Sequence, residues 1–218
     1  YESVTGRVRI HRMSENELGS LLPSPVYICL KALVDWCLIL VSAPLTVPLI
    51  LIAALCIKIE SPGPALYTQT RMGRGNKPFR LYKLRSMYHG STNGSQFAGE
   101  DDPRITRVGR VIRKYRIDEL PQFINIFKGE MSLIGPRPEQ PDFVAEFDRK
   151  LPFYIYRHVV KPGITGWAQV RQGYAADVDA TREKIEHDFY YIKHCSMFLD
   201  AFIVLLTIKT LCTGYGSR

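Results

Sequence analysis

Two adjacent carboxylates, Asp118 and Glu119, lie among arginines in the middle of this chain. Arg113 and Arg116 precede the pair, and Arg137 follows it between two prolines. Guanidinium groups bind phosphate oxygens, while a carboxylate attacks phosphorus or holds a metal ion. A long apolar segment precedes these residues, so the pattern predicts a metal-assisted reaction on a phosphate that a lipid carries.

The carboxylates stand just before Leu-Pro-Gln, which is typical of a helix start with proline in its first turn. Asp118 is therefore either a plain N-cap, since acids complement the helix dipole, or a nucleophile. For the second role, the dipole and Arg113 or Arg116 would keep Asp118 ionised at neutral pH, as attack on phosphorus requires. Adjacent helical side chains diverge, so Glu119 is expected to hold metal or act as the acid–base partner.

Further cations are candidate phosphate contacts. Arg137 is stiffened by Pro136 and Pro138, so less entropy is lost when it binds. Lys83 and Arg85 lie on one face of a predicted strand, by its period of two. The plainer alternatives are an ordinary proline-rich turn and a solvated strand edge.

A second candidate region follows at Lys-Pro-Gly-Ile-Thr-Gly-Trp. Gly163 and Gly166 bracket a predicted tight turn, where backbone amides could approach a phosphate or base. Trp167 is a candidate for stacking on uracil, although tryptophan after a turn more often lies in a core.

Residues 36–57 contain no charged side chain, and this run is long enough to cross a bilayer as one straight helix. Pro44 and Pro48 interrupt this run near its middle and should kink it. Cations flank it on both sides, and such flanks stay in the cytoplasm, so we expect a re-entrant helix–break–helix. A kinked single-pass anchor is the alternative. Lys31 and Asp35 have the spacing of a helical ion pair.

The remaining pattern predicts an α/β fold leaning towards α+β, a small irregular sheet with surrounding helices and interfacial amphipathic helices. Strands are expected over 65–69 and 79–87, and a strand is expected after the turn at Lys161. The helices expected are 106–115, 120–127, 139–151 and 181–193, together with an apolar one over 197–211 that lies in the headgroup interface or in the core. Residues 89–102 are expected to form a mobile loop. We divide the chain into a linker from a missing N-terminal region (1–24), a membrane anchor (25–60) and a catalytic domain with an interfacial C-terminal helix (61–218).

Composition adds a net charge of +8, which favours anionic partners, and five cysteines. The cysteines lack the spacing of a zinc or redox motif and are expected to be reduced thiols or small apolar fillers.

Five motifs then occur in an order seen in a known family: Tyr82-Lys-Leu-Arg-Ser-Met, Asp118-Glu-Leu-Pro-Gln, Lys128-Gly-Glu-Met-Ser-Leu-Ile-Gly-Pro-Arg-Pro, Pro162-Gly-Ile-Thr-Gly-Trp-Ala-Gln-Val and Asp188-Phe-Tyr-Tyr. With these motifs the chain resembles the monotopic polyprenyl-phosphate phosphoglycosyl transferases, the bacterial sugar transferase family. The run Arg171-Gln-Gly-Tyr departs from the more usual Asn- or Ser-Gly-Arg.

The resemblance implies that a sugar-1-phosphate moves from a UDP-sugar to undecaprenyl phosphate, with UMP released, in the first membrane step of bacterial surface glycan assembly. It implies Mg²⁺ and an aspartyl-phosphosugar intermediate, which we assign to Asp118. Asp118 and Glu119 are the candidate metal ligands. Asp188 and Tyr191 become candidate nucleotide-sugar contacts by the same analogy, and a helix cap or a salt bridge is the alternative role for Asp188. A hexose donor is favoured. The site implied is on the cytoplasmic face of the bacterial inner membrane, in contact with its lipid, and a homo-oligomer is allowed.

Two other classes compete with the enzyme. A basic membrane-surface binding module would explain the charge but gives no reason for the Asp–Glu pair. An inactive scaffold of a glycan assembly complex would not need the pair, which is present. Nucleic acid is not expected as a partner.

Overall fold

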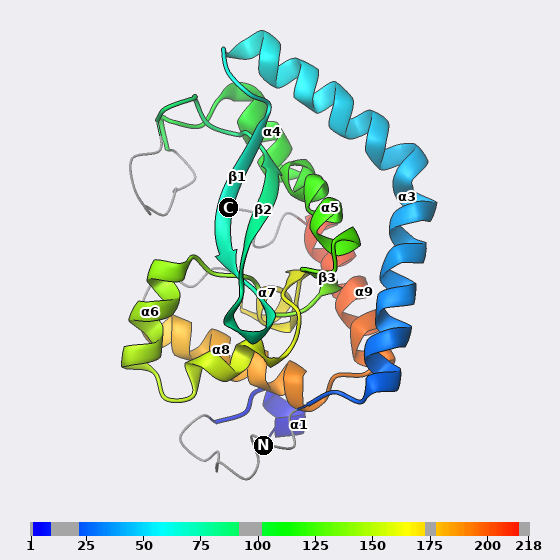
Figure 1. The fold of residues 1–218 in the computed structure, drawn as a ribbon, viewed down its shortest axis with the longest axis vertical. Coiled ribbons are helices and arrows are strands. Elements are labelled where there is room, and N and C mark those ends of the chain that lie inside the picture. Colours follow the sequence, from blue (N-terminus) through cyan, green and yellow to red (C-terminus); the bar gives the residue numbers. More distant parts are fainter. Residues whose placement is uncertain (1, 10–21, 92–101, 173–177, 214–218) are drawn as a thin grey trace.

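The computed structural model describes residues 2–9, 22–91, 102–172 and 178–213 (Figure 1). The helices are α1 (Glu2–Thr5), α3 (Pro25–Glu60), α4 (Arg107–Lys114), α5 (Phe123–Phe127), α6 (Pro141–Lys150), α7 (Trp167–Arg171), α8 (Val178–Lys193) and α9 (Met197–Thr213). Short 3-10 helices are η2 (Arg74–Asn76), η3 (Ile117–Gln122) and η4 (Tyr154–Val159), and the strands are β1 (Leu66–Met72), β2 (Pro78–Leu84), β3 (Ser132–Ile134) and β4 (Gly163–Thr165).

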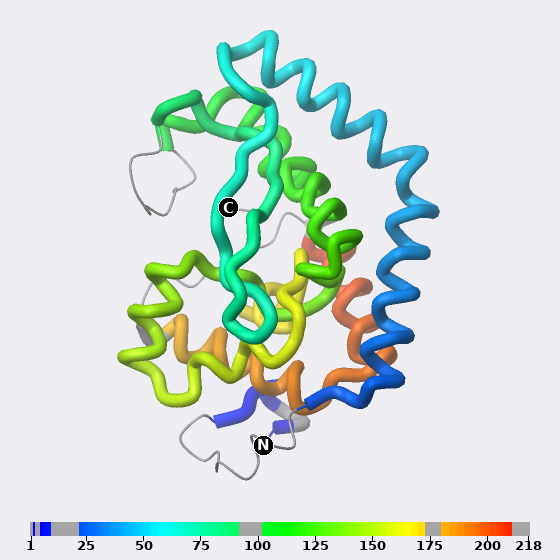
Figure 2. The backbone as a smooth tube through the Cα atoms, in the orientation of Figure 1, coloured from blue at the N-terminus to red at the C-terminus, as the bar shows by residue number. Residues whose placement is uncertain are grey.

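The apolar segment forms one continuous helix, α3, which bends near its middle as it arches along one side of the molecule (Figure 2). Pro44 and Pro48 lie inside it and each lacks a helix donor. The hydroxyls of Ser42 and Thr46 donate back to the carbonyls of Ile39 and Ser42, a contact that favours bending. The prolines therefore bend the helix without breaking it, which corrects the expected helix–break–helix.

Both halves of α3 pack on the same body, while its middle is exposed. Ile39 lies in one hydrophobic cluster with β2 and α5 residues, and Ala53 and Ile57 lie in another with β2 and α4 residues. Between Ile39 and Ala53, a stretch that the structure describes throughout, no residue is buried. The helix is long and apolar enough to cross a membrane, and only 11% of its most apolar window is buried, which indicates membrane association.

The two small sheets hold the loops of the site. Strands β1 and β2 form an antiparallel hairpin across the glycine-rich turn, with Leu66 opposite Leu84 and Met72 opposite Pro78. Strands β3 and β4 pair in parallel, with Ser132 opposite Gly163. Helices α7, α8 and α9 cover this second pair through the largest cluster, which includes Leu151 and Phe189.

The fold class is confirmed, as are the hairpin strands and the helices that become α4, α6, α8 and α9. The strand expected after the turn at Lys161 is present as the short β4, but it ends before Gly166, and the segment that follows is helix α7. The 3-10 helix η4 was not foreseen, and Lys31 pairs with Asp200 at 2.7 Å instead of with Asp35. The expected 1–24 linker and 89–102 loop fall partly on residues 10–21 and 92–101, outside the described residues.

Helix α9 lies partly in the core, which was one of the two alternatives expected for it. Ile203 and Asp200 are buried, whereas Phe198 is 84% exposed and Leu205 is 64% exposed. One face of the helix thus packs on the core, and the other presents apolar side chains to the surroundings.

Candidate active site

The Asp–Glu pair lies in the first turn of η3, between α4 and α5. Arg116, directly before it, adopts a left-handed backbone with φ of 53°, a conformation uncommon for arginine. This reversal turns the chain sharply at the end of α4, so that Arg113 on α4 and Asp118 on η3 come close together. The helix start predicted at the pair is confirmed, in its 3-10 form.

Glu119 is held by three cations from three elements. Its Oε1 accepts from Lys83 of β2 at 3.0 Å and from Arg137 at 2.8 Å. Its Oε2 lies 3.9 Å from Arg116. Burial alone would raise the pKa of Glu119, but Arg137, Lys83 and Arg116 outweigh it and hold the pKa below its ordinary value. Glu119 is therefore a fixed anion.

Asp118 has the opposite environment. The residue is 9% exposed, and its carboxylate has no hydrogen bond or ion pair with any residue that the structure describes. Burial raises its pKa to about 6, helped by the charge of Glu119 and opposed by Lys83, Arg113 and Arg137. The sequence predicts that nearby cations determine the pKa of Asp118, but the effect of burial on that pKa is larger. At this pKa the carboxylate form still predominates at pH 7.

The surrounding cations outnumber the two carboxylates. Lys83, Arg113, Arg116 and Arg137 all lie close enough to shift the pKa of one acid or the other. Within the described residues, Arg113 Nη1 is buried without a hydrogen-bond partner. A site with excess positive charge and an unpaired guanidinium nitrogen suits a phosphate or diphosphate.

The donor set also fits a divalent cation such as Mg²⁺. Glu119 Oε2 is buried without a hydrogen-bond partner in the described structure, and the Asp118 carboxylate beside it is unpaired. No group of three His, Cys, Asp or Glu side chains suited to a metal occurs among the described residues. Mg²⁺ is commonly held by one or two carboxylates with substrate phosphate and water, so two carboxylates suffice.

Arg85 does not join this site. It is 6% exposed, and its guanidinium donates to the carbonyls of Ser61 and Pro62 at 2.8 and 2.6 Å. It thereby caps the C-terminal end of α3. Lys83 and Arg85 both lie at the C-terminal end of β2, but Lys83 contacts Glu119 whereas Arg85 contacts the segment that ends α3.

Gly163 and Gly166 allow backbones to pack, where an approach to a phosphate or base was expected. A Cβ at Gly163 would lie 2.1 Å from Gly135 N, and one at Gly166 would lie 2.2 Å from Gly135 O. The amide of Gly163 donates to Pro136 O at 3.0 Å. These glycines bring β4 against the segment that leads to Arg137.

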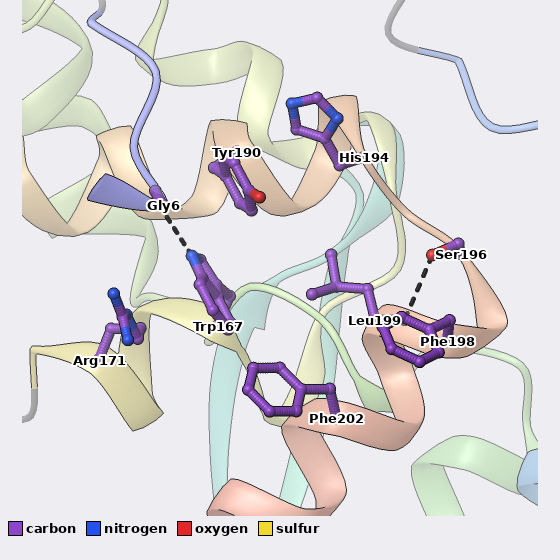
Figure 3. Close-up of a pocket in the computed structure, with 9 residues that line it drawn as sticks. All are labelled: Gly6, Trp167, Arg171, Tyr190, His194, Ser196, Phe198, Leu199 and Phe202. Atoms are coloured by element: carbon purple, nitrogen blue, oxygen red, sulfur yellow. Dashed lines mark hydrogen bonds between the residues drawn. The ribbon is translucent and has the colours of Figure 1, made fainter. Parts of the chain in front are cut away.

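Trp167 lines an aromatic cleft whose lining includes neither Asp118 nor Glu119 (Figure 3). Its indole nitrogen donates to Gly6 O at 2.8 Å, and its ring stacks on Tyr190 at 5.6 Å between centroids. The cleft has a volume of about 440 Å³ and is lined further by Arg171, His194, Ser196, Phe198, Leu199 and Phe202. The indole is 6% exposed, as the alternative of a core tryptophan predicted.

Asp188 and Tyr191 are also buried and partnered within the protein. Asp188 accepts from Arg157 Nη2 at 2.6 Å, and Tyr191 donates to Asp200 at 2.8 Å. As they lie, neither side chain is presented to a ligand beside Asp118. Sequence reasoning missed Arg157, Arg71 and Glu139, which surround the Arg137 loop. One signal of this arrangement was present in the sequence. Lys184, Asp188 and Tyr191 have a spacing that places their side chains on one face of a helix.

Comparison with known proteins identifies the family of the chain. The bacterial sugar transferase family matches residues 26–214. An Aeromonas hydrophila protein, named UDP-N-acetylgalactosamine-undecaprenyl-phosphate N-acetylgalactosaminephosphotransferase, is 60% identical over the whole chain, which covers 52% of that protein.

Two other relatives are named UDP-glucose:undecaprenyl-phosphate glucose-1-phosphate transferase. The Caulobacter vibrioides protein is 42% identical over 89% of this chain and 74% of its own. The Xanthomonas campestris pv. campestris protein is 39% identical over 83% of this chain and 38% of its own. The present chain thus spans about half the length of the Aeromonas protein. Since the family match covers most of the chain, this protein belongs to the bacterial sugar transferase family.

Proposed function

We propose that the protein transfers a sugar-1-phosphate from a UDP-sugar to undecaprenyl phosphate and releases UMP. The observation that carries the proposal is the Asp118 carboxylate, buried yet unpaired among the described residues and surrounded by cations. The names of the relatives supply the two substrates. If Asp118 served only as a helix N-cap, it would need neither its burial nor the four cations around the pair.

The chemistry that fits this arrangement has two steps. One oxygen of Asp118 attacks the β-phosphorus of the UDP-sugar, and the bond from that phosphorus to the bridging oxygen breaks, so UMP leaves. An oxygen of undecaprenyl phosphate then attacks the same phosphorus, the bond to Asp118 breaks, and the carboxylate is regenerated. Each displacement is in line, and the surrounding arginines stabilise charge on the equatorial oxygens.

The residues around Asp118 then have distinct tasks. Arg113, with its unpaired nitrogen, would bind the phosphate that Asp118 attacks. Arg137 and Lys83 hold Glu119, and each has further donors for the diphosphate. Mg²⁺, held by Glu119 and Asp118 together with substrate, would neutralise charge on the departing UMP.

We place the site at the cytoplasmic face of the inner membrane, with α3 entering the bilayer and returning. Support comes from the contacts of both ends of α3 with one body. Lys31 pairs with Asp200 near its start, and Glu60 at its end accepts from the amides of Arg107 and Val108 at 2.7 and 3.0 Å. A helix that crossed the bilayer would present its two ends on opposite sides.

The relatives are named for different sugars, so the donor has to be measured. The 60% identical protein is named for N-acetylgalactosamine, and we rank that donor above the hexose that the family resemblance favours. The test is UMP release from UDP-GalNAc, UDP-GlcNAc, UDP-glucose and UDP-galactose, with Mg²⁺ and with or without undecaprenyl phosphate.

The expected result is sustained, lipid-dependent UMP release with one preferred sugar, lost in Asp118→Asn while that folded variant still binds donor. The absence of release from folded wild-type protein with every donor would favour the binding-module or scaffold alternative. Full turnover in Asp118→Asn would remove Asp118 from the mechanism.

A further inference from the structure

The loop that carries Arg137 is fixed at each of four successive carbonyls. Pro136 and Pro138 have no N–H, so this segment has few donors of its own. Gly163 N donates to Pro136 O at 3.0 Å, and Arg157 Nη2 donates to Arg137 O at 3.0 Å. Arg71 Nη1 donates to Pro138 O at 3.2 Å, and Met72 N donates to Glu139 O at 2.9 Å. Donors from three other parts of the chain thus set the backbone of the loop.

One face of α8 supports this loop from behind. Lys184, Asp188 and Tyr191 have the spacing i, i+4 and i+7, which places them on one side of a helix. Lys184 pairs with Glu139, Asp188 pairs with Arg157, and the Tyr191 hydroxyl lies 3.4 Å from Ile134 O. As α8 advances from 184 to 191, its contacts therefore step back along the loop from 139 to 134.

Arg157 is the link between α8 and the reactive end of the loop. Its side chain is 2% exposed, and its nitrogens reach Asp188, the Tyr154 hydroxyl and Arg137 O. Desolvating an ion pair costs as much as the pair returns, so stability alone is a weak reason for burying one here. A planar guanidinium with several fixed donors does, however, define the position of the carbonyl that it binds.

We propose that Arg157 and Asp188 are positioning residues for the transfer reaction. Together they fix the backbone at Arg137, so that its guanidinium meets Glu119 Oε1 at 2.8 Å beside Asp118. The inference rests on the proposed function. It gives Asp188 a role different from the nucleotide contact expected from its motif.

The first test compares kcat/KM for UMP release in wild type, Arg157→Lys and Asp188→Asn. Lysine keeps the charge but cannot reach Asp188, Tyr154 and the carbonyl together, so we expect a loss of about 10- to 100-fold, typical of a misplaced catalytic geometry. Glu183→Gln is the matched control on another part of α8, where Glu183 pairs with Arg7. It should keep activity within about twofold of wild type.

A double-variant cycle separates positioning from general damage. If Arg157 acts through Arg137, Arg157→Lys should cost less than about threefold in an Arg137→Lys background, because the group that it positions has already been changed. Fold-losses that multiply in the double variant would overturn the proposal. So would full activity in a folded Arg157→Lys protein.

Arg71→Lys keeps the test decisive if Arg157→Lys does not fold. Arg71 holds the next carbonyl, Pro138 O, from a side chain that is 17% exposed, and the same cycle with Arg137→Lys applies. Multiplying losses there would contradict the positioning role of the loop contacts. If wild type and Glu183→Gln both release no UMP, the proposed function fails and this inference fails with it. If wild type is active and Arg157→Lys is equally active, only the inference fails.

Discussion

The two neighbouring carboxylates of η3 differ because their surroundings differ. Glu119 is tied to Lys83 and Arg137 and remains an anion, while Asp118 is buried, unpaired among the described residues and has a raised pKa. Environments that shift the pKa values of two acids in opposite directions allow one site to give its two carboxyl groups separate roles. In the proposed mechanism, Glu119 therefore holds the surrounding cations and Asp118 attacks the phosphorus.

A third acid, Glu139, makes a pH prediction outside the dyad. Burial would raise its pKa, but Lys184, Arg157 and Arg71 lower it to about 2 from 4.5. Because the folded-state pKa is depressed, the ionised carboxylate stabilises the fold above pH 4.5, by about 3 kcal/mol at about 1.4 kcal/mol per unit. That stabilisation is lost as the pH falls from 4.5 towards 2.

Thermal unfolding of wild type and Glu139→Gln at pH 7, 4 and 3 checks this prediction. The variant should melt lower at pH 7, and the difference should shrink as the pH falls. A difference in Tm that stays constant or widens towards pH 3 would show that Glu139 is not held ionised by these partners. Glu146→Gln, in an exposed pair with Lys150, serves as a control and should change Tm little at any pH.

At the scale of elements, α4 is placed by close backbone contact with the end of β2. Gly109 on α4 packs against Ser86, where an added Cβ would lie 2.0 Å from the carbonyl oxygen. The same carbonyl accepts from Thr106 N at 3.1 Å, and Thr106 caps the helix. Arg113 reaches the dyad because α4 can lie this near.

Gly109→Ala should therefore displace α4. We expect a loss of stability of about 1–3 kcal/mol, typical of overpacking, and a fall in transferase activity as Arg113 moves. Differential scanning calorimetry measures the stability, and the UMP-release assay measures the activity. Val111→Ala on the exposed side of the same helix should change neither by much, and an unperturbed Gly109→Ala would refute the close contact.

Sequence reasoning located these elements better than it located their contacts. Local signals in a sequence mark turns and helix starts. They therefore located the Asp–Glu pair at a helix start, the hairpin with Lys83 and the proline-flanked Arg137, all of which meet at one site. Arg85, Asp188 and Tyr191 were assigned to substrates because charge and motif cannot tell which way a side chain is used. The partners of Arg85 and Asp188, which are Ser61 and Arg157, lie 24 and 31 residues away, and Asp200 lies nine residues from Tyr191 on the next helix. Only tertiary packing reveals these contacts.

At the scale of the whole molecule, apolar surface is concentrated where a membrane would lie. The middle of α3 and the outer face of α9 are exposed, in a chain whose net charge is +8. Soluble monomers rarely expose contiguous apolar area of this kind. The bend of α3 and the attachment of both its ends to one body favour a helix that returns to the side it entered from (Figure 1).

Cysteine labelling tests this topology. In a chain whose five native cysteines are replaced by serine, Leu22→Cys and Lys58→Cys mark the two ends of α3 and Leu45→Cys marks its middle. A membrane-impermeant thiol reagent should label both ends in inverted inner-membrane vesicles, neither end in spheroplasts, and the middle in neither. Labelling of one end from each side would establish a single crossing instead.

The central claim is that Asp118 carries the sugar phosphate, and the intact mass of the protein tests it most directly. Folded protein is incubated with Mg²⁺ and the preferred UDP-sugar, without undecaprenyl phosphate, and quenched at short times. The account predicts a covalent adduct of one sugar phosphate that maps to Asp118, is absent in Asp118→Asn and disappears when the lipid is added. An adduct-free protein that nonetheless turns over with lipid, or an adduct that persists in Asp118→Asn, would contradict it.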